Sequence, residues 1–338
     1  MKKNKKILYI GNDNSARTGY VNTMETLSSL LTKEGYKITR SSTKVNKALR
    51  LLDMCGATIK HGRKSDYIFI DTFSSLNFYF AFTISQLARL FSIKYIPILH
   101  GGNLPSRIKR SKRMSNMIFK NSYKNISPSN YLKQAFEEQG YEVGHIPNVL
   151  EIDQYKFKKR EDLKPRLLWV RAFKHLYNPL LAIEVINNLK KEFSEVKLCM
   201  VGPVIDDSFK KTQQKVKEYG MTDDVEYTGT LSKEVWVKRS EEFDIFINTT
   251  NFDNTPVSVM EAMALGLPVV STNVGGMPFL IENNVDGMLV EKENAEEMTN
   301  AIKKLLKTDS TALVDKARSK AESFGWEQVK TKWFEILD

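Results

Sequence analysis

Short β-branched runs alternate with helix-like segments along almost the whole chain. Eight runs are predicted to be buried strands, at residues 6–11, 67–71, 94–99, 166–170, 196–202, 225–229, 245–249 and 268–272. Segments with apolar residues at helical spacing lie between them, such as 180–193 and 296–306. Strands that alternate with helices build parallel sheets, because each parallel connection needs a crossover. The sequence therefore predicts an α/β protein with helices on both faces of its sheets.

The alternation restarts in the middle of the chain. Residues 151–165, EIDQYKFKKREDLKP, form a charged stretch that we interpret as a linker, and RLLWV at 166–170 opens a second series. A chain of 338 residues suits two domains of about 150 residues each. We therefore expect two Rossmann-like doubly wound domains, 1–150 and 151–322. Their ligand should bind in the cleft that the carboxyl ends of the strands face.

Composition and missing motifs limit which cellular compartment and which class of protein the sequence can belong to. Cys55 and Cys199 stand far apart, which favours a reducing compartment and argues against a zinc site. The N-terminus lacks the long apolar stretch of a signal peptide, and FYFAFTI at 78–84 is too short to span a bilayer. The segment after the first strand, 11–20, has no GxGxxG, which argues against a dinucleotide-dependent dehydrogenase. We expect a cytoplasmic protein.

The positive charge of the chain is concentrated in its first half. Residues 1–150 hold 24 of the 51 basic and nine of the 40 acidic side chains, so they carry all of the excess. This asymmetry indicates an anionic partner for that half. The densest run, RIKRSKR at 107–113, precedes apolar residues typical of an interfacial membrane contact, Met114, Met117, Ile118 and Phe119. A solvated basic helix is the alternative. We expect no nucleic acid, since no recognition motif accompanies the charge.

Residues 252–276, FDNTPVSVMEAMALGLPVVSTNVGG, combine a helix start with two acids. Pro256 suits the first position of a helix that ends before Gly266. Free N–H groups at such a start form an anion site suited to a diphosphate. Glu261 lies on the apolar side of this helix, where a carboxylate is costly unless it is hydrogen-bonded. Hydroxyls of a sugar or ribose would meet that need. The alternative is structural, with Glu261 paired to a buried arginine or backbone amides and Asp253 as a cap.

This stretch resembles the E-x7-E signature of the retaining glycosyltransferases of family 4. Further segments resemble the family in the same order: HIPNVLEIDQYKF at 145–157 (I-P-N-G-V-D-x-x-x-F), MVGP at 200–203, VEYTGTLSKEVW at 225–236, FDIFINTT at 243–250, VDGMLVE at 285–291 and FGWEQV at 324–329. The resemblance covers essentially the whole chain and is strongest over 165–330. It implies the GT-B fold, two Rossmann-like doubly wound domains facing a central cleft. Residues 323–338 would form a helix that crosses back to the N-terminal domain.

The resemblance also implies roles for single residues. Glu261 takes the place of the acid that holds the nucleotide ribose, and Asp253 that of the acid that contacts the donor sugar. The residues expected to cradle the sugar and diphosphate are Asn254, Thr255, Pro256, Val257 and Gly202. Arg171 matches the arginine that supports the diphosphate, since its planar fork suits phosphate oxygens.

Three departures from the family pattern stand out. The first acid is Asp253, which is one methylene shorter than glutamate. The lysine expected five residues after Arg171 is Leu176, so either Lys174 replaces it or the second cation is missing. The usual Gly-Gly loop after the first strand is Thr18-Gly19, which we expect to contact the acceptor or a phosphate.

His100 ends a strand of the N-terminal domain, where the family often has a histidine near the donor sugar. A turn histidine bonded to backbone is the alternative. We expect Asp253, Arg171 and His100 to act in catalysis, without metal or other cofactor. The implied reaction moves a sugar from a UDP- or GDP-sugar to a glycan or lipid-linked acceptor, in cell-surface polysaccharide synthesis beside an anionic membrane. A nucleotide-sugar-binding protein without transfer activity is the alternative.

Overall fold

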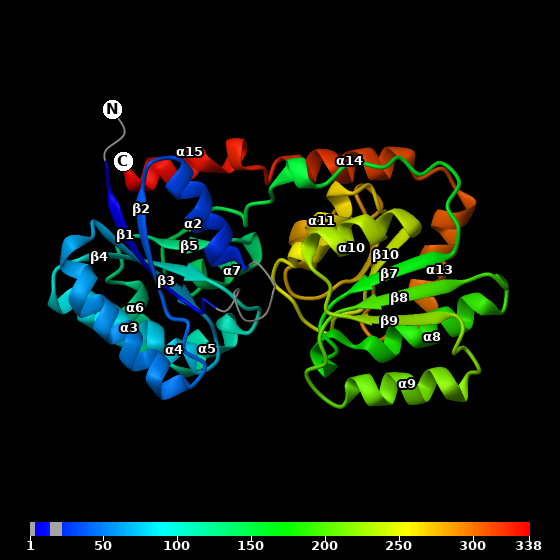
Figure 1. The fold of residues 1–338 in the computed structure, drawn as a ribbon, viewed down its shortest axis with the longest axis horizontal. Helices are drawn as coiled ribbons and strands as arrows, with labels where there is room; N and C mark the ends of the chain where they lie inside the picture. The colour runs from blue at the N-terminus through cyan, green and yellow to red at the C-terminus, as the bar shows by residue number, and fades with distance from the viewer. Residues whose placement is uncertain (1–3, 14–21) are drawn as a thin grey trace. The chain divides into compact units, whose positions relative to one another are not determined.

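The computed structural model describes residues 4–13 and 22–338, and the chain forms two compact units (Figure 1). The first unit consists of Met1–Val149 and Trp326–Asp338, and the second of Leu150–Gly325. Each unit has one six-stranded sheet in which all paired strands are parallel. Among the residues described, no helix combines the length and apolar character needed to cross a membrane.

The first sheet has the strand order β2-β1-β3-β4-β5-β6. Its strands are β1 (Lys6–Ile10), β2 (Lys37–Ser41), β3 (Tyr67–Thr72), β4 (Lys94–Leu99), β5 (Asn125–Ser127) and β6 (Val143–His145). The helices among the described residues of this unit are α2 (Thr23–Lys33), α3 (Lys47–His61), α4 (Asn77–Leu90), α5 (Leu104–Arg110), α6 (Lys112–Phe119), α7 (Asn130–Glu137) and α15 (Trp326–Leu337).

Alternate residues of the first sheet pack against two helical layers. Tyr9 and Phe69 lie in one core with residues of α2 and α15, among them Trp333. Leu8 and Ile70 point the other way, into a core formed with α3 and α4. This alternation follows from the two-residue period of a strand, and it buries both faces as parallel sheets require.

The second sheet has the strand order β12-β11-β10-β7-β8-β9. Its strands are β7 (Arg166–Val170), β8 (Lys197–Val201), β9 (Val225–Gly229), β10 (Ile245–Asn248), β11 (Val269–Thr272) and β12 (Met288–Val290). The helices are α8 (Pro179–Lys190), α9 (Ser208–Glu218), α10 (Lys233–Arg239), α11 (Val257–Ala264), α12 (Met277–Leu280), α13 (Ala295–Lys307) and α14 (Thr311–Glu322). Residues of α8, α9 and α13 share one core with the sheet, and residues of α10, α11 and α14 share the other.

All eight predicted strands are present, with ends that differ by at most one residue from the prediction. The sequence did not indicate β2, β5, β6 and β12. Three of these have three residues each, too few to establish an alternating pattern. β2 has the sequence KITRS and is mostly exposed at the edge of its sheet, so it lacks the apolar run of a buried strand.

Residues 151–165 belong to the second unit, so their interpretation as a linker was wrong. Tyr155 and Arg160 are 1% and 5% exposed. The guanidinium of Arg160 donates to backbone carbonyl oxygens at 2.9 to 3.0 Å, among them those of Ser240, Phe243 and Leu265. Burial lowers the pKa of Arg160 to about 10. The charge of this segment suggested solvent, but carbonyl groups satisfy the buried arginine instead.

Two of the four apolar residues that follow RIKRSKR are buried and so cannot make the predicted membrane contact. Ile118 and Phe119 are 0% and 3% exposed, and they pack in the core of the first unit. Met114 packs against the same core. The basic residues Lys112 and Arg113 remain exposed, so this region offers charge to a partner but little apolar surface.

Candidate active site

The strand order of the second unit reverses between β7 and β10. β8 and β9 continue the sheet on one side of this pair, and β11 and β12 continue it on the other. Ligands of open parallel sheets bind at the carboxyl ends of the strands at such a switch point. Arg171 directly follows β7, and the loop 249–256 directly follows β10. Both therefore lie at the edge where a ligand is expected.

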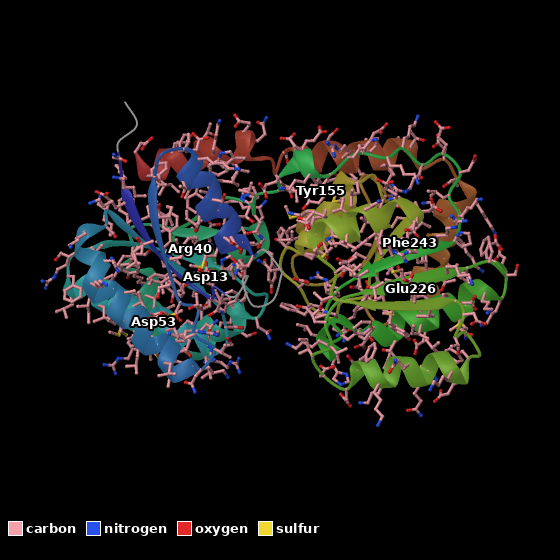
Figure 2. All side chains as sticks on the ribbon, viewed as in Figure 1. Asp13, Arg40, Asp53, Tyr155, Glu226 and Phe243 are labelled. Carbon is pink, nitrogen blue, oxygen red and sulfur yellow. The ribbon has the colours of Figure 1, made fainter. Side chains whose placement is uncertain are left out.

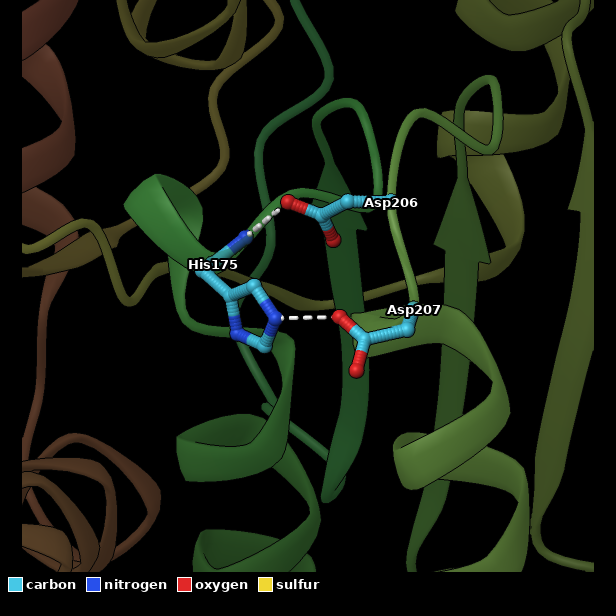
Figure 3. A group of neighbouring side chains, drawn as sticks. All are labelled: His175, Asp206 and Asp207. Atoms are coloured by element: carbon cyan, nitrogen blue, oxygen red, sulfur yellow. Dashed lines mark hydrogen bonds and ion pairs between the residues drawn. The ribbon is translucent and has the colours of Figure 1, made fainter.

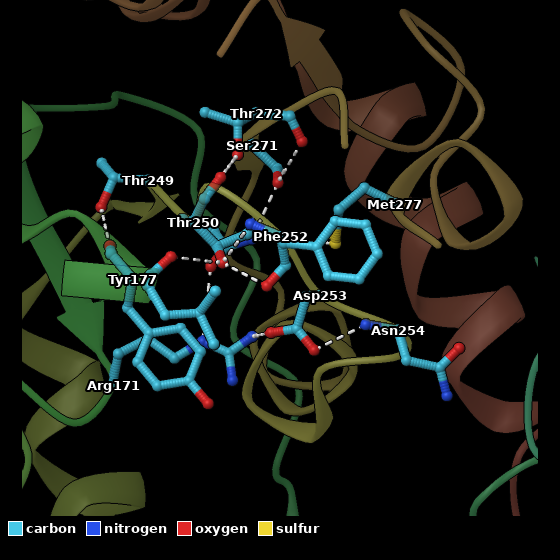
Figure 4. Close-up of polar contacts among 12 residues, drawn as sticks. Arg171, Tyr177, Thr249, Thr250, Phe252, Asp253, Asn254, Ser271, Thr272 and Met277 are labelled. Carbon is cyan, nitrogen blue, oxygen red and sulfur yellow. Dashed lines mark hydrogen bonds and ion pairs between the residues drawn. The ribbon is translucent and has the colours of Figure 1, made fainter. Parts of the chain in front are cut away.

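Arg171 and Asp253 form an ion pair at this edge. Nη2 of Arg171 lies 2.5 Å from Oδ2 of Asp253, and the two side chains are 13% and 18% exposed (Figure 4). Nε of Arg171 also donates to Oδ1 of Asn248 at 3.4 Å. The ring of Tyr177 lies beside the guanidinium, with its centroid 4.9 Å from Cζ. The structure thus brings together two of the three residues predicted for catalysis.

Two glycines allow the backbone to pass close to this ion pair. A Cβ atom on Gly202 would lie 1.8 Å from the carbonyl oxygen of Arg171. One on Gly276 would lie 1.8 Å from the carbonyl oxygen of Asn254. No larger residue fits either position without displacing the chain. Gly202, predicted to bind a donor, therefore lies directly against the backbone of Arg171.

Helix α11 begins one residue later than predicted. Pro256 is its N-cap, with an extended backbone, and its carbonyl oxygen accepts from the N–H groups of Val259 and Met260. No side chain caps this helix among the residues described. The hydroxyl oxygen of Ser258 is buried, and it has no hydrogen-bond partner among the residues that the structure describes. Since the first N–H groups of a helix lack partners within it, this end can receive an anion.

Glu261 lies in the middle of α11 and is 5% exposed. Oη of Tyr155, labelled in Figure 2, donates to its Oε1 at 2.6 Å. Nζ of Lys233 lies 3.7 Å from the same oxygen and 5.0 Å from the centroid of the Tyr155 ring. Burial raises the pKa of Glu261 above its usual range, against the opposing effects of Tyr155 and Lys233. The structural alternative named a buried arginine or backbone amides as the partners of Glu261, whereas the contacts described here come from a tyrosine and a lysine.

Lys174 is exposed and precedes a short 3-10 helix at His175–Tyr177. Nε2 of the next residue, His175, lies 2.5 Å from Oδ1 of Asp207, and the backbone N–H of His175 donates to Oδ2 of Asp206 (Figure 3). The ligand atoms of these three residues lie within 4.8 Å of one another, although their spacing in the sequence did not suggest a metal. Nζ of Lys211 already lies 2.9 Å from Asp207. Because the acids have cationic and backbone partners, we assign no ion here.

His100 lies at the carboxyl edge of the first sheet, directly after β4. Its Nε2 is 3.0 Å from Oδ1 of Asp71, and Oη of Tyr9 donates to the same oxygen at 3.0 Å. The ring stacks on Phe73 with centroids 5.1 Å apart. The side chains of His100 and Asp71 are 10% and 6% exposed. A buried carboxylate therefore holds the ring, which the sequence did not indicate. Thr18 and Gly19 lie outside the described residues.

Tyr155, Lys233 and Asp71 contact predicted site residues but were not themselves predicted. Tyr155 stands at the aromatic position that ends the I-P-N-G-V-D-x-x-x-F pattern, so its place could have been found, but the partner of its hydroxyl could not. Lys233 begins α10, and Asp71 lies near the end of β3. No spacing in the sequence connects either residue to Glu261 or His100.

The family profile matches the second unit, and the curated relatives align with about half of the chain. The family profile described as "Glycosyl transferases group 1" matches residues 151–323. The chain is 28% identical over 184 residues to the amylovoran biosynthesis glycosyltransferase AmsK of Erwinia amylovora, covering 52% of this chain and 45% of AmsK. It is 26% identical over 156 residues to the sulfoquinovosyl transferase SQD2 of Arabidopsis thaliana, covering 45% of this chain and 29% of SQD2. The alignments thus span less than half of either relative.

Solved glycosyltransferase structures have the same fold along the whole chain. Sucrose-phosphate synthase from Thermosynechococcus elongatus superimposes with a TM-score of 0.83 at 15% identity, covering 98% of both chains. Anabaena HepE in complex with UDP and glucose gives a TM-score of 0.76 at 15% identity, covering 98% of this chain and 99% of HepE. These likenesses establish the GT-B fold. Since the family profile also matches just over half of the 338 residues, this chain belongs to the glycosyl transferases group 1.

Proposed function

We propose that this chain transfers a sugar from a UDP- or GDP-sugar to a hydroxyl group of a glycan or lipid-linked acceptor, with retention at the anomeric carbon. One arrangement carries the proposal: Asp253 and Glu261 flank the start of α11, and Arg171 reaches the same loop from β7. A nucleoside diphosphate sugar carries matching groups in the matching order, which are a sugar, two phosphates and a ribose.

In this proposal each part of the donor has its own partner. Glu261 accepts hydrogen bonds from the neighbouring ribose hydroxyls, for which a carboxylate has two oxygens. The diphosphate is bound by Arg171 and by the first N–H groups of α11. The hydroxyl of Ser258, which has no partner among the described residues, also binds it. Asp253 accepts from hydroxyls of the donor sugar, and the backbone at 254–257 lies along the sugar and diphosphate.

The reaction breaks the bond between the anomeric carbon and a diphosphate oxygen, and it forms a bond from the same carbon to the acceptor oxygen. Negative charge develops on the departing diphosphate, and Arg171 and the start of α11 stabilise it electrostatically. We therefore propose chemistry without a metal ion. The acceptor proton passes to the departing phosphate on the same face of the sugar, which accounts for retention without a covalent intermediate. His100 is proposed as a hydrogen-bond partner of a substrate hydroxyl.

The names of relatives support the choice of substrates. AmsK is an amylovoran biosynthesis glycosyltransferase, and the lipopolysaccharide galactosyltransferase WaaB has the same fold, with a TM-score of 0.69 at 16% identity and 98% and 99% coverage. HepE has been solved with UDP-glucose. These names favour UDP over GDP as the donor nucleotide, and they support the proposed role in surface polysaccharide synthesis at the cytoplasmic face of the membrane.

A nucleotide screen tests this function. UDP, GDP and their common sugars are added to the protein in a thermal-shift assay, and donor hydrolysis is followed with and without EDTA. We expect one nucleotide class to raise Tm by several degrees, since a ligand at 100 times its Kd adds about 2.7 kcal/mol. EDTA should leave turnover unchanged. Failure of every nucleotide to stabilise the protein contradicts the proposal. Stabilisation without hydrolysis or transfer supports the binding-protein alternative.

Lys233→Met is expected to weaken nucleotide binding about five- to tenfold. The ammonium of Lys233 faces Oε1 of Glu261, so it favours the charged carboxylate that ribose hydroxyls need. Methionine keeps the apolar stem over Tyr155 but removes the charge. The matched control is Lys174→Met, an exposed change that should alter Kd less than twofold. Calorimetric titration with the nucleotide measures both. The reverse ranking would make Lys174 the cation that replaces the missing lysine.

A further inference from the structure

Helix α3 presents an apolar stripe to solvent. Leu49, Leu52 and Ile59 are 56%, 68% and 57% exposed, and Val45, just before the helix, is 58% exposed. Positions 49, 52 and 59 share one side of the helix, because intervals of three and seven residues return to the same face. The side that holds Met54 and Thr58 is buried against the first unit. A surface helix normally turns polar residues outward, so this stripe is unusual.

Basic residues stand at both ends of the stripe. Ala48 and Gly56, the other exposed positions within it, also lack polar side chains. The exposed basic residues are Lys44 and Lys47 at its start and Lys60, Arg63 and Lys64 at its end. The acid of this helix, Asp53, accepts a hydrogen bond from the hydroxyl of Ser41. The stripe is about 15 Å long at 1.5 Å per residue.

We propose that α3 lies on the surface of an anionic lipid membrane. Its leucine and isoleucine side chains enter the boundary between headgroups and acyl chains, and the basic residues at both ends contact lipid phosphates. The excess of positive charge in residues 1–150 attracts the whole unit to such a surface. A second copy of the chain is a poor occupant, because two-fold packing of this stripe would bring lysines close to lysines.

Helix α3 turns the stripe away from the core of the first unit. α3 and α4 lie side by side on one face of the first sheet, and α3 contributes Met54 to the core beneath it (Figure 1). The basic run at 107–113 adds charge but no anchor, since Ile118 and Phe119 behind it are buried. The membrane contact of α3 rests on the proposed function only for its role, which would be to bring the enzyme to a lipid-linked acceptor.

Vesicle flotation tests the apolar part of the proposal. Wild-type protein is floated with phosphatidylcholine vesicles that contain or lack phosphatidylglycerol. The variant Leu49→Ser/Leu52→Ser/Ile59→Ser should reduce partitioning into anionic vesicles at least about tenfold, because each serine removes apolar surface that the boundary would bury. The matched control is Val204→Ser/Ile205→Ser in the second unit, whose side chains are 55% and 58% exposed. It should float like the wild type, and neither variant should lose Tm.

Charge variants separate α3 from the basic run. Replacing Lys44, Lys47 and Lys60 by glutamine should weaken binding about fivefold for each lysine near the surface, and added salt should weaken wild-type binding. Flotation of the triple serine variant at wild-type level, with loss of binding on replacing Lys109, Arg110, Lys112 and Arg113, would overturn the assignment to α3. A wild-type dimer that the serine variant loses would instead identify a second copy as the occupant. Nucleotide thermal shifts on the same samples report on the proposed function separately.

Discussion

Glu261→Ala is expected to weaken nucleotide binding by at least about 100-fold. The carboxylate would accept from two ribose hydroxyls, and each hydrogen bond to a charged group contributes about 1.5–3 kcal/mol. Alanine removes both acceptors, together with the contacts that the hydroxyl of Tyr155 and the ammonium of Lys233 make to Glu261. Calorimetric titration of the nucleotide found in the screen measures the change. The exposed Glu296→Ala is the control and should keep the wild-type Kd. Equal Kd values for Glu261→Ala and wild type would make Glu261 a structural acid.

The charge of Glu261 can be tested without ligand by Glu261→Gln. Burial raises its pKa in the folded protein above 4.5, the value of the free side chain. Between pH 4.5 and the folded pKa, the folded state therefore binds more protons than the unfolded state, so stability falls as pH rises through this window. Glutamine keeps the shape without the charge. We expect the glutamine variant to have a higher Tm than wild type at pH 7, with a difference that shrinks as pH approaches 4.5. A lower Tm at pH 7 contradicts this sign.

The charged side chains of the candidate site pair with one another. Arg171 is paired with Asp253, and Glu261 is contacted by Lys233 and Tyr155. Unpaired buried charges would cost several kcal/mol each, so such pairing allows the site to fold before the donor arrives. In the proposed function, donor binding exchanges these partners: phosphate replaces Asp253 at Arg171, and ribose hydroxyls approach Glu261. This exchange follows from the proposed function and explains why charged residues lie close together at the switch point.

The fold and part of the site were predictable because they depend on local sequence. A parallel strand ends where its β-branched run ends, so Arg171 had to lie at the carboxyl edge of β7. The partners were not predictable, because they depend on packing between distant segments. Tyr155 is 106 residues away from Glu261, and no pattern links the two. The chemical character of a residue also fails to predict its exposure at some positions. Arg160 is buried despite its charge, whereas Leu52 is exposed despite its apolar side chain.

Arg171→Met is expected to lower turnover of the donor sugar about 10²- to 10³-fold. Removing one preorganised donor that faces developing negative charge costs this much in other enzymes. Methionine fills much of the same volume, so the backbone contact with Gly202 should persist. The matched control is Arg166→Met at the exposed amino end of the same strand, which should keep wild-type turnover. Steady-state rates of donor hydrolysis measure both variants.

A loss of turnover in Arg171→Met could also come from breaking the ion pair with Asp253. A double-mutant cycle separates this explanation from a direct effect on the departing diphosphate. If Arg171 serves only to hold Asp253, Arg171→Met adds nothing to the effect of Asp253→Asn, because the single variants already break the same contact. In the proposed reaction, phosphate occupies Arg171 while Asp253 contacts the sugar, so the two losses in turnover should multiply. Turnover of the double variant equal to that of Asp253→Asn alone would therefore rule out Arg171 as the group that stabilises the departing diphosphate.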